Sequence, residues 1–180
     1  MDCVFDSNAN KVVIFYTDTN NPSTDSRTGT AIVGTVSGTS ISFGTKAAFE
    51  SGNTQEINAC FDSTNNKLVV TYRDAGNSNY GTSGTVSGTG ISFGTPVVFN
   101  SAGTTAAIAV DFDANAGKVV VAYQDSGDGA KGKAIVGTVS GTSISFGSEA
   151  TFDSGVVGHT EVVYDASAQK TVIAYLDAIN

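Results

Sequence analysis

Side chains that suit ligand binding occur along this chain where loops are expected between strands. Carboxylates, amides and a tyrosine ring are the groups that the hydroxyls and C–H faces of a saccharide require. Ten residues form the candidate ligand-binding set on this reasoning: Asp25, Arg27, Gln55, Glu56, Asn77, Asn79, Tyr80, Asp128, Lys131 and His159. Because most loops have such a composition, the elements that position these residues decide what they can do.

Catalytic motifs are missing from the sequence. His159 is the single histidine, and no Gly-x-Ser-x-Gly segment accompanies it. The two arginines are too few for a sialidase-like centre, and nothing selects an acid pair among seventeen carboxylates. We therefore expect no enzymatic activity and no catalytic residues, with a glycoside hydrolase kept as the second alternative.

Metal and phosphate motifs are incomplete as well. One histidine and two cysteines cannot build a zinc site. The turn 113–117 resembles the opening of a calcium loop, but Gln124 stands where a bidentate acid is needed. The glycine-rich segment 127–134 is followed by an expected strand, whereas a phosphate loop must open a helix. We expect no metal and no cofactor.

The composition predicts an all-β protein. The 180 residues include 21 Val, 10 Ile, 22 Thr and 20 Ser but only 2 Leu, and β-branched residues favour extended structure. The 21 glycines and only 2 prolines indicate tight turns built from Gly, Asn and Asp. The formal net charge of −8 argues against a nucleic-acid partner, which requires a basic face.

Two alternating motifs repeat along the chain with a period of 51 to 56 residues. Gly-Thr-Val-Ser-Gly-Thr-Ser-Ile-Ser-Phe-Gly occurs at 34–44 and 137–147, and at 84–94 with one Ser changed to Gly. The segment 5–18, with its Lys and Tyr in fixed positions, matches 61–74, 112–125 and 164–177. We treat the chain as one repeat domain with copies at approximately 1–53, 54–104, 105–157 and, in part, 158–180.

Each complete copy is predicted to form four short antiparallel strands, A to D. In the third copy these are 106–112, 118–123, 134–139 and 143–152. Unbroken apolar runs in strand B predict burial on both faces. Asp-x-x-x-(Asn/Gly/Gln)-Lys predicts A–B turns, and Ser-Gly-Thr predicts C–D turns. Four strands per repeat are typical of a β-propeller, here about 3.5 blades, and essentially no helix is expected. A β-solenoid is the main alternative.

The loops divide into two groups in this arrangement. The A–B and C–D turns lie on one face and hardly vary between copies, whereas the B–C and D–A loops lie on the other face and vary freely. Variable loops on a fixed scaffold suit specific binding, and loops without any constraint would look the same. The acids that end each strand B, Asp18, Asp74, Asp125 and Asp177, are expected to cap the following turns rather than to form a cation site.

The repeated Phe-Asp-x-x-x-x-Lys-Val-Val-x-x-Tyr-x-Asp and Gly-Thr-Val-Ser-Gly-Thr-x-Ile-Ser-Phe-Gly-Thr units resemble β-propeller-type repeat arrays of marine phage virion or tail-associated proteins and of secreted proteins of marine bacteria. The resemblance covers nearly the whole chain. It implies a scaffold used for binding or display, located in a virion or outside the cell, and it provides no catalytic residues.

These observations predict a non-enzymatic binding or display module that recognises a cell-surface glycan or protein through the variable loops. A purely structural scaffold or spacer is the first alternative. Open strand edges predict a homo-oligomer, with a dimer favoured. No signal peptide or membrane-inserted segment is recognised. Cys3 and Cys60 are expected to be two buried thiols rather than a disulfide.

Overall fold

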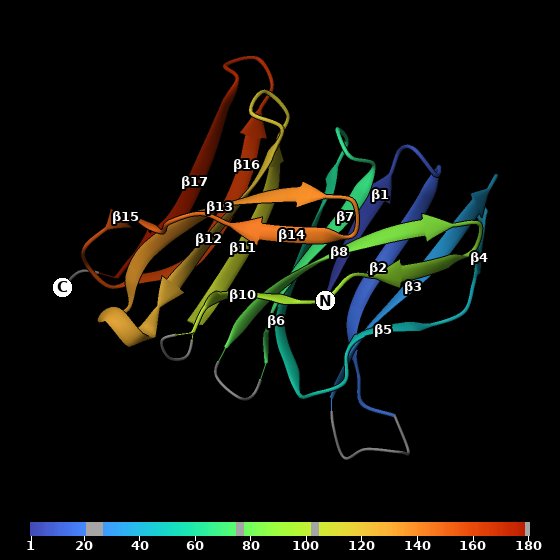
Figure 1. The fold of residues 1–180 in the computed structure, drawn as a ribbon, viewed down its shortest axis with the longest axis horizontal. Helices are drawn as coiled ribbons and strands as arrows, with labels where there is room; N and C mark the ends of the chain where they lie inside the picture. The colour runs from blue at the N-terminus through green and yellow to red at the C-terminus, as the bar shows by residue number, and fades with distance from the viewer. Residues whose placement is uncertain (21–26, 75–77, 102–104, 179–180) are drawn as a thin grey trace.

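The computed structural model describes residues 1–20, 27–74, 78–101 and 105–178 and confirms the all-β prediction. These residues form seventeen strands and one 3-10 turn, η1 (Ser126–Asp128), which the sequence did not predict (Figure 1). Among the described residues, no helix is long and apolar enough to cross a membrane.

Three five-stranded sheets and one hairpin follow each other along the chain (Figure 1). Sheet 1 contains β1 (Asp2–Asp6), β2 (Lys11–Asp18), β3 (Thr28–Ser37), β4 (Ser40–Phe43) and β5 (Ala47–Glu50). Sheet 2 contains β6 (Thr54–Asp62), β7 (Lys67–Asp74), β8 (Asn79–Ser87), β9 (Gly90–Phe93) and β10 (Val97–Asn100). Sheet 3 contains β11 (Thr105–Asp113), β12 (Lys118–Asp125), β13 (Lys131–Ser140), β14 (Ser143–Phe146) and β15 (Ala150–Asp153). Hairpin 4 contains β16 (Val157–Asp165) and β17 (Lys170–Asp177).

The predicted fourth strand of each repeat is split into two segments. In sheet 1, β4 and β5 both pair antiparallel with β3, over different parts of its length. The interruption lies at Gly44, whose N–H donates a 2.9 Å bond to the Val33 carbonyl. A Cβ on Gly44 would lie 1.8 Å from the Thr89 carbonyl oxygen, so the backbone of the next repeat approaches closely at this point. The prediction of one continuous strand D is therefore wrong.

The A–B turns form as predicted. The Asp6 carboxylate accepts hydrogen bonds from the N–H groups of Asn8 and Ala9, at 3.0 and 2.8 Å. Asp62, Asp113 and Asp165 make corresponding bonds in their own turns. The residue before each Lys has a left-handed φ of 53° to 63°, at Asn10, Asn66, Gly117 and Gln169. Each turn thus combines an acceptor side chain with one left-handed residue.

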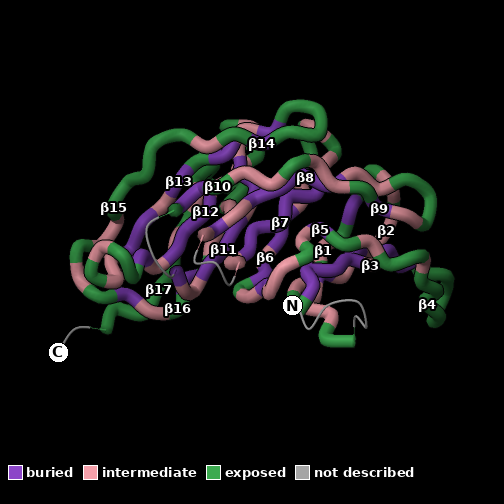
Figure 2. Tube along the Cα trace, turned by 60° about the horizontal axis from the view of Figure 1, so that its bottom comes forward, coloured by how far each residue is buried: buried purple, intermediate pink, exposed green. Residues whose placement is uncertain are grey.

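The hydrophobic core lies between the sheets, which pack face to face. One cluster joins sheets 1 and 2, and the other joins sheets 2 and 3. Strand β7 is buried on both faces, since Leu68, Val69 and Val70 have no exposed surface, as predicted for strand B. Figures 1 and 2 show sheet 1 and hairpin 4 at opposite ends of this row, so one chain forms an open arrangement.

The cysteines differ from expectation in one respect. Both are free thiols, and Cys60 is buried as predicted, but Cys3 is exposed. The prediction of two buried thiols is wrong for Cys3 because, in the described part of the chain, no further sheet covers the outer side of β1. At the corresponding position in sheet 2, Ala59 is covered by sheet 1.

Candidate functional site

A β-bulge recurs at the same place in strand A of three repeats. The pairing register slips between Gln55 and Asn58 in β6, between Ala106 and Ala109 in β11, and between Gly158 and Thr160 in β16. The bulged residues are Glu56, Ala107 and His159, with left-handed φ angles of 50°, 52° and 39°. Such a conformation is costly for residues other than glycine, and bulges re-aim the side chain that they carry.

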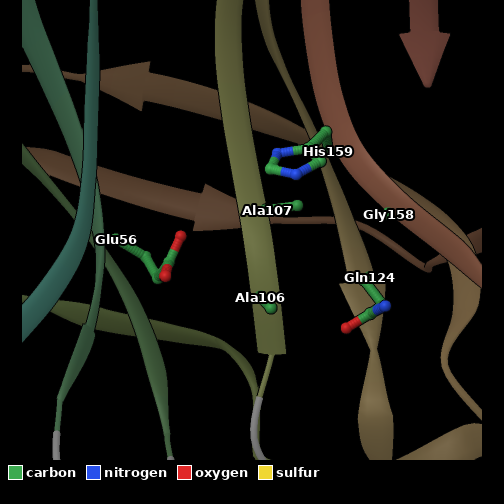
Figure 3. A pocket seen from close by; sticks show the side chains of 6 residues that line it. All are labelled: Glu56, Ala106, Ala107, Gln124, Gly158 and His159. Carbon is green, nitrogen blue, oxygen red and sulfur yellow. The ribbon is translucent and has the colours of Figure 1, made fainter. Parts of the chain in front are cut away.

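The three bulges lie side by side because the A strands of successive repeats are neighbours. Figure 3 shows Glu56 and His159 on either side of Ala107, which belongs to the central strand. A pocket of about 270 Å³ lies between them, lined by Glu56, Ala106, Ala107, Gln124, Gly158 and His159. Glu56 and His159 are exposed, so both side chains are accessible to a ligand.

Hydrogen bonds between repeats hold the A strands beside the bulges. In three repeats, strand B ends in an Asp, and the side chain of the residue just before it donates a hydrogen bond to the next repeat. The acceptor is the backbone carbonyl of the first residue of the next strand A. Thr17 bonds Thr54 at 3.1 Å, and Arg73 bonds Thr105 at 3.2 Å. Gln124 donates its amide N–H to Val157 in the same way. The three bulges are therefore fixed relative to one another, while their side chains differ.

This arrangement presents a carboxylate and an imidazole across a small pocket, with the Gln124 amide at its edge. Together these groups accept and donate hydrogen bonds, as ligand hydroxyls require. The pocket lies toward the end of the sheets that carries the B–C and D–A connections. At this end the start of β6 pairs with the end of β7, as Thr54 with Asp74, and the end of β7 pairs with the start of β8, as Arg73 with Asn79. Two of the ten candidates, Glu56 and His159, are thus brought together.

Three other candidates have structural contacts. Gln55 accepts a hydrogen bond from Arg73. Asn79 is fully buried, accepts from Thr105 and donates to Asn100. Tyr80 stacks on Tyr72 with ring centroids 5.7 Å apart. Asn79 and Tyr80 were selected as loop residues, but both already belong to β8.

The remaining candidates lie apart from the pocket or outside the described residues. Asp25 and Asn77 fall in segments that the structure does not describe. Arg27 is exposed just before β3, and its carbonyl accepts a 2.8 Å bond from Thr54. Asp128 and Lys131 form an ion pair of 2.8 Å.

The Asp128 carboxylate also pairs with buried Lys133, at 2.9 Å, and Lys133 reaches Glu149 at 3.0 Å. Hydrogen bonds from Lys131 and Lys133 lower the pKa of Asp128, and those acidic partners raise the pKa of Lys133. The glycine-rich segment ends in this ion-pair network, with β13 rather than a helix beginning at Lys131.

Two of the acids that end strand B cap the next turn, as predicted. Asp18 accepts from the Asn20 N–H at 3.0 Å, and Asp125 accepts from the Gly127 N–H at the same distance. In the described part of the chain, no three His, Cys, Asp or Glu side chains gather as a metal site would require.

Comparison with known proteins gives no family. No protein-family model matches the chain, and no curated protein matches it either. The site is therefore defined by the fold and by the contacts of its own residues.

Sequence reasoning missed the bulges themselves. Ala106, Ala107, Gln124 and Gly158 line the pocket but were not candidates. A left-handed residue in a strand is usually signalled by glycine, and here the positions carry Glu, Ala and His. The available signal was alignment of the repeats, which places all three residues five positions before the aromatic residue near the end of strand A.

Proposed function

We propose that this chain is a non-enzymatic binding or display module that recognises a cell-surface glycan through the bulge pocket and the neighbouring variable loops. One observation carries the proposal: the same strained backbone recurs in three repeats while its side chain changes from Glu56 to Ala107 to His159. A fixed backbone with interchangeable side chains is how a rigid scaffold varies its specificity.

The four-plus-one-stranded sheets are interpreted as propeller blades. Strands β1, β6, β11 and β16 are neighbours in succession, as the innermost strands of blades are, and the split fourth strands lie at the opposite sheet edge. Propeller blades surround a central channel. The bulged side chains would then line one mouth of that channel, next to the variable loops. The repeats' resemblance to virion and secreted arrays supports a location in a virion or outside the cell.

A glycan is favoured over a protein partner because the pocket is small and three of its six lining residues carry polar side chains. Its volume of about 270 Å³ suits one or two sugar-sized groups. A carboxylate, an imidazole and an amide are suitable partners for sugar hydroxyls. Weak single sites of this kind gain strength when several are presented together.

A glycan array probed with the labelled protein tests the proposal. We expect binding to a defined group of glycans that is lost in Glu56→Gln and His159→Gln. Lys170→Gln is the matched control, since Lys170 is exposed at the other end of β17. No glycan binding, or equal binding by all variants, would contradict the proposal. Capture of a surface protein in place of a glycan would favour a protein partner.

A structural scaffold is the second candidate function. It is favoured by the side-chain bonds that join each strand B to the next strand A. In that case, exchanging the loop 126–130 for a different sequence would leave assembly and biological role intact. Loss of the role with assembly retained would favour the binding function.

A further inference from the structure

The outer face of sheet 1 carries the residues that elsewhere form the core between sheets. Phe5, Val36, Ile41 and Phe43 are 46% to 58% exposed. Their counterparts in sheet 3 are Phe112, Val139, Ile144 and Phe146, which pack in the cluster against sheet 2. A hollow of about 420 Å³ lined by Met1, Asp2, Cys3 and Ile14 lies on the same face. This face has the composition of a repeat interface, and no neighbouring sheet covers it among the described residues.

The outer face of hairpin 4 is the opposite half of such an interface. Val163 and Val172 are 56% and 46% exposed and pair directly across the two strands. The counterparts of Val172 in the first two repeats are Val13 and Val69, which are completely buried against the next sheet. Hairpin 4 therefore offers the kind of face that sheets 1 and 2 pack onto their successors.

A recurring hydrogen bond gives the register in which the two faces would meet. In each case a side chain on strand A accepts a hydrogen bond from a backbone N–H on strand A of the next repeat. When the repeats are aligned, the donor residue stands one position after the acceptor residue. Asp2 accepts from Ala59 at 2.7 Å, and Asn58 accepts from Val110 at 3.2 Å. At the third boundary the bond lies two positions further along the strands, where Asp111 accepts from Tyr164 at 2.8 Å.

Glu161 occupies the position of Asp2 and Asn58 in the fourth repeat, where it is exposed. Cys3 occupies the position of Ala59 and Val110 in the first repeat, and its N–H is bonded only to the adjacent Asp2 side chain among the described contacts. The Glu161 carboxylate in hairpin 4 and the Cys3 N–H in sheet 1 are thus an acceptor and a donor of the same kind, at the two ends of the row of sheets.

We propose that hairpin 4 of one copy packs onto the outer face of sheet 1 of a second copy, as each repeat packs onto the next within the chain. Val163 and Val172 then cover Phe5 and the hollow beside Cys3, and Glu161 accepts a hydrogen bond from the Cys3 N–H of the second copy. Two such contacts would close two copies into one ring of eight A–B hairpins, within the range of propellers. This interface does not depend on the proposed glycan binding.

Light scattering on the wild-type chain and two variants tests the contact. The wild type is expected to have a mass of twice 18.3 kDa. The dimer fraction should rise with salt concentration, because each copy has a net charge of −8 and salt screens the repulsion between the copies. Val172→Asp and Phe5→Asp each introduce a charge into one of the two contacting faces, since both side chains are about half exposed, and each variant should be monomeric. Far-UV circular dichroism checks that the variants remain folded. Mixed together, they retain one intact pair of faces and should regain the dimer mass.

Covalent trapping tests the register. Glu161→Cys treated with a short bis-maleimide should give a cross-linked dimer between positions 161 and 3, and Cys3→Ser in the same background should abolish it. A contact between two hairpins would instead leave Phe5→Asp dimeric and would cross-link position 161 to position 161 without Cys3. Either of those results, or a wild type that stays monomeric at several hundred micromolar, would overturn the proposal.

Discussion

The Tyr72 hydroxyl in sheet 2 donates a 3.0 Å hydrogen bond to the Glu50 carboxylate of sheet 1. Tyr175 makes the corresponding 2.9 Å bond to Asp153, across the boundary between sheet 3 and hairpin 4. Burial, followed by the nearby Glu50 charge, raises the pKa of Tyr72 far above its usual value, so the phenol remains a donor. At these two boundaries the tyrosine that keeps its position in every repeat therefore links its repeat to the preceding one, whereas the Tyr123 hydroxyl donates to Glu149 of its own repeat.

Removing this link should weaken the stack of sheets. We expect Tyr72→Phe to lower the free energy of unfolding by about 1.5–3 kcal/mol, the usual range for a hydrogen bond to a charged group. Urea unfolding followed by circular dichroism measures the change. Tyr16→Phe is the matched control, because this ring lies on the open face of sheet 1 under exposed Lys46. Equal effects of the two changes would contradict the role of the Tyr72 bond.

A glycine at position 169 should stabilise the A–B turn of hairpin 4. Gln169 has a φ of 54°, where the corresponding residue of sheet 3 is Gly117 with a φ of 63°. Since left-handed backbone costs a residue with a Cβ about 1 kcal/mol, we expect Gln169→Gly to raise the unfolding free energy by up to about 1 kcal/mol. Thermal unfolding measures it, with Gly117→Ala expected to change stability in the opposite direction.

The two thiols should react at very different rates. Cys3 is exposed, whereas burial raises the pKa of the Cys60 thiol and keeps reagents away from it. We expect a disulfide reagent at pH 8 to titrate one thiol in the native protein and two in denaturant. Cys3→Ser should leave no rapidly reacting thiol, and fast modification of Cys60 in that variant would show that the boundary between sheets 2 and 3 opens.

Asp113 should respond to a change in the neighbouring hairpin. The N–H of Ala116 lowers the pKa of Asp113, and the Thr171 hydroxyl, 2.9 Å away, lowers it further. Because the pKa is lower in the folded state, the stabilisation is present above the unfolded pKa and is lost as the pH falls through the folded value. We expect Thr171→Val to raise the pKa of Asp113 in an NMR titration. An unchanged value would show that hairpin 4 does not contact this turn in solution.

The repeat order, the A–B turns and the buried strand B could be predicted because their causes are local. Asp6 and Asn10 lie within one turn, and the run Leu68–Tyr72 shows its burial by composition. The break in the fourth strand could not be predicted. Gly44 leaves room for the Thr89 carbonyl, a contact 45 positions away that only the packing of repeats creates.

The candidate site was predicted only in part, for a similar reason. Glu56 and His159 were selected as polar loop residues, but their proximity follows from bulges within strands β6 and β16. Asn79 looked like a loop amide and instead fills a buried position between Thr105 and Asn100. Side-chain type suggested the chemistry, whereas the stacking of A strands determined which side chains meet.

Calorimetric titration of the tightest-binding glycan from the array is the most direct test of the account. The wild type is compared with Glu56→Gln/His159→Gln, after unfolding curves establish that the two proteins are equally stable. We predict that the double variant binds at least about tenfold more weakly, which corresponds to about 1.4 kcal/mol for the lost hydrogen bonds. An unchanged affinity would place the binding surface away from the bulges and contradict the central claim.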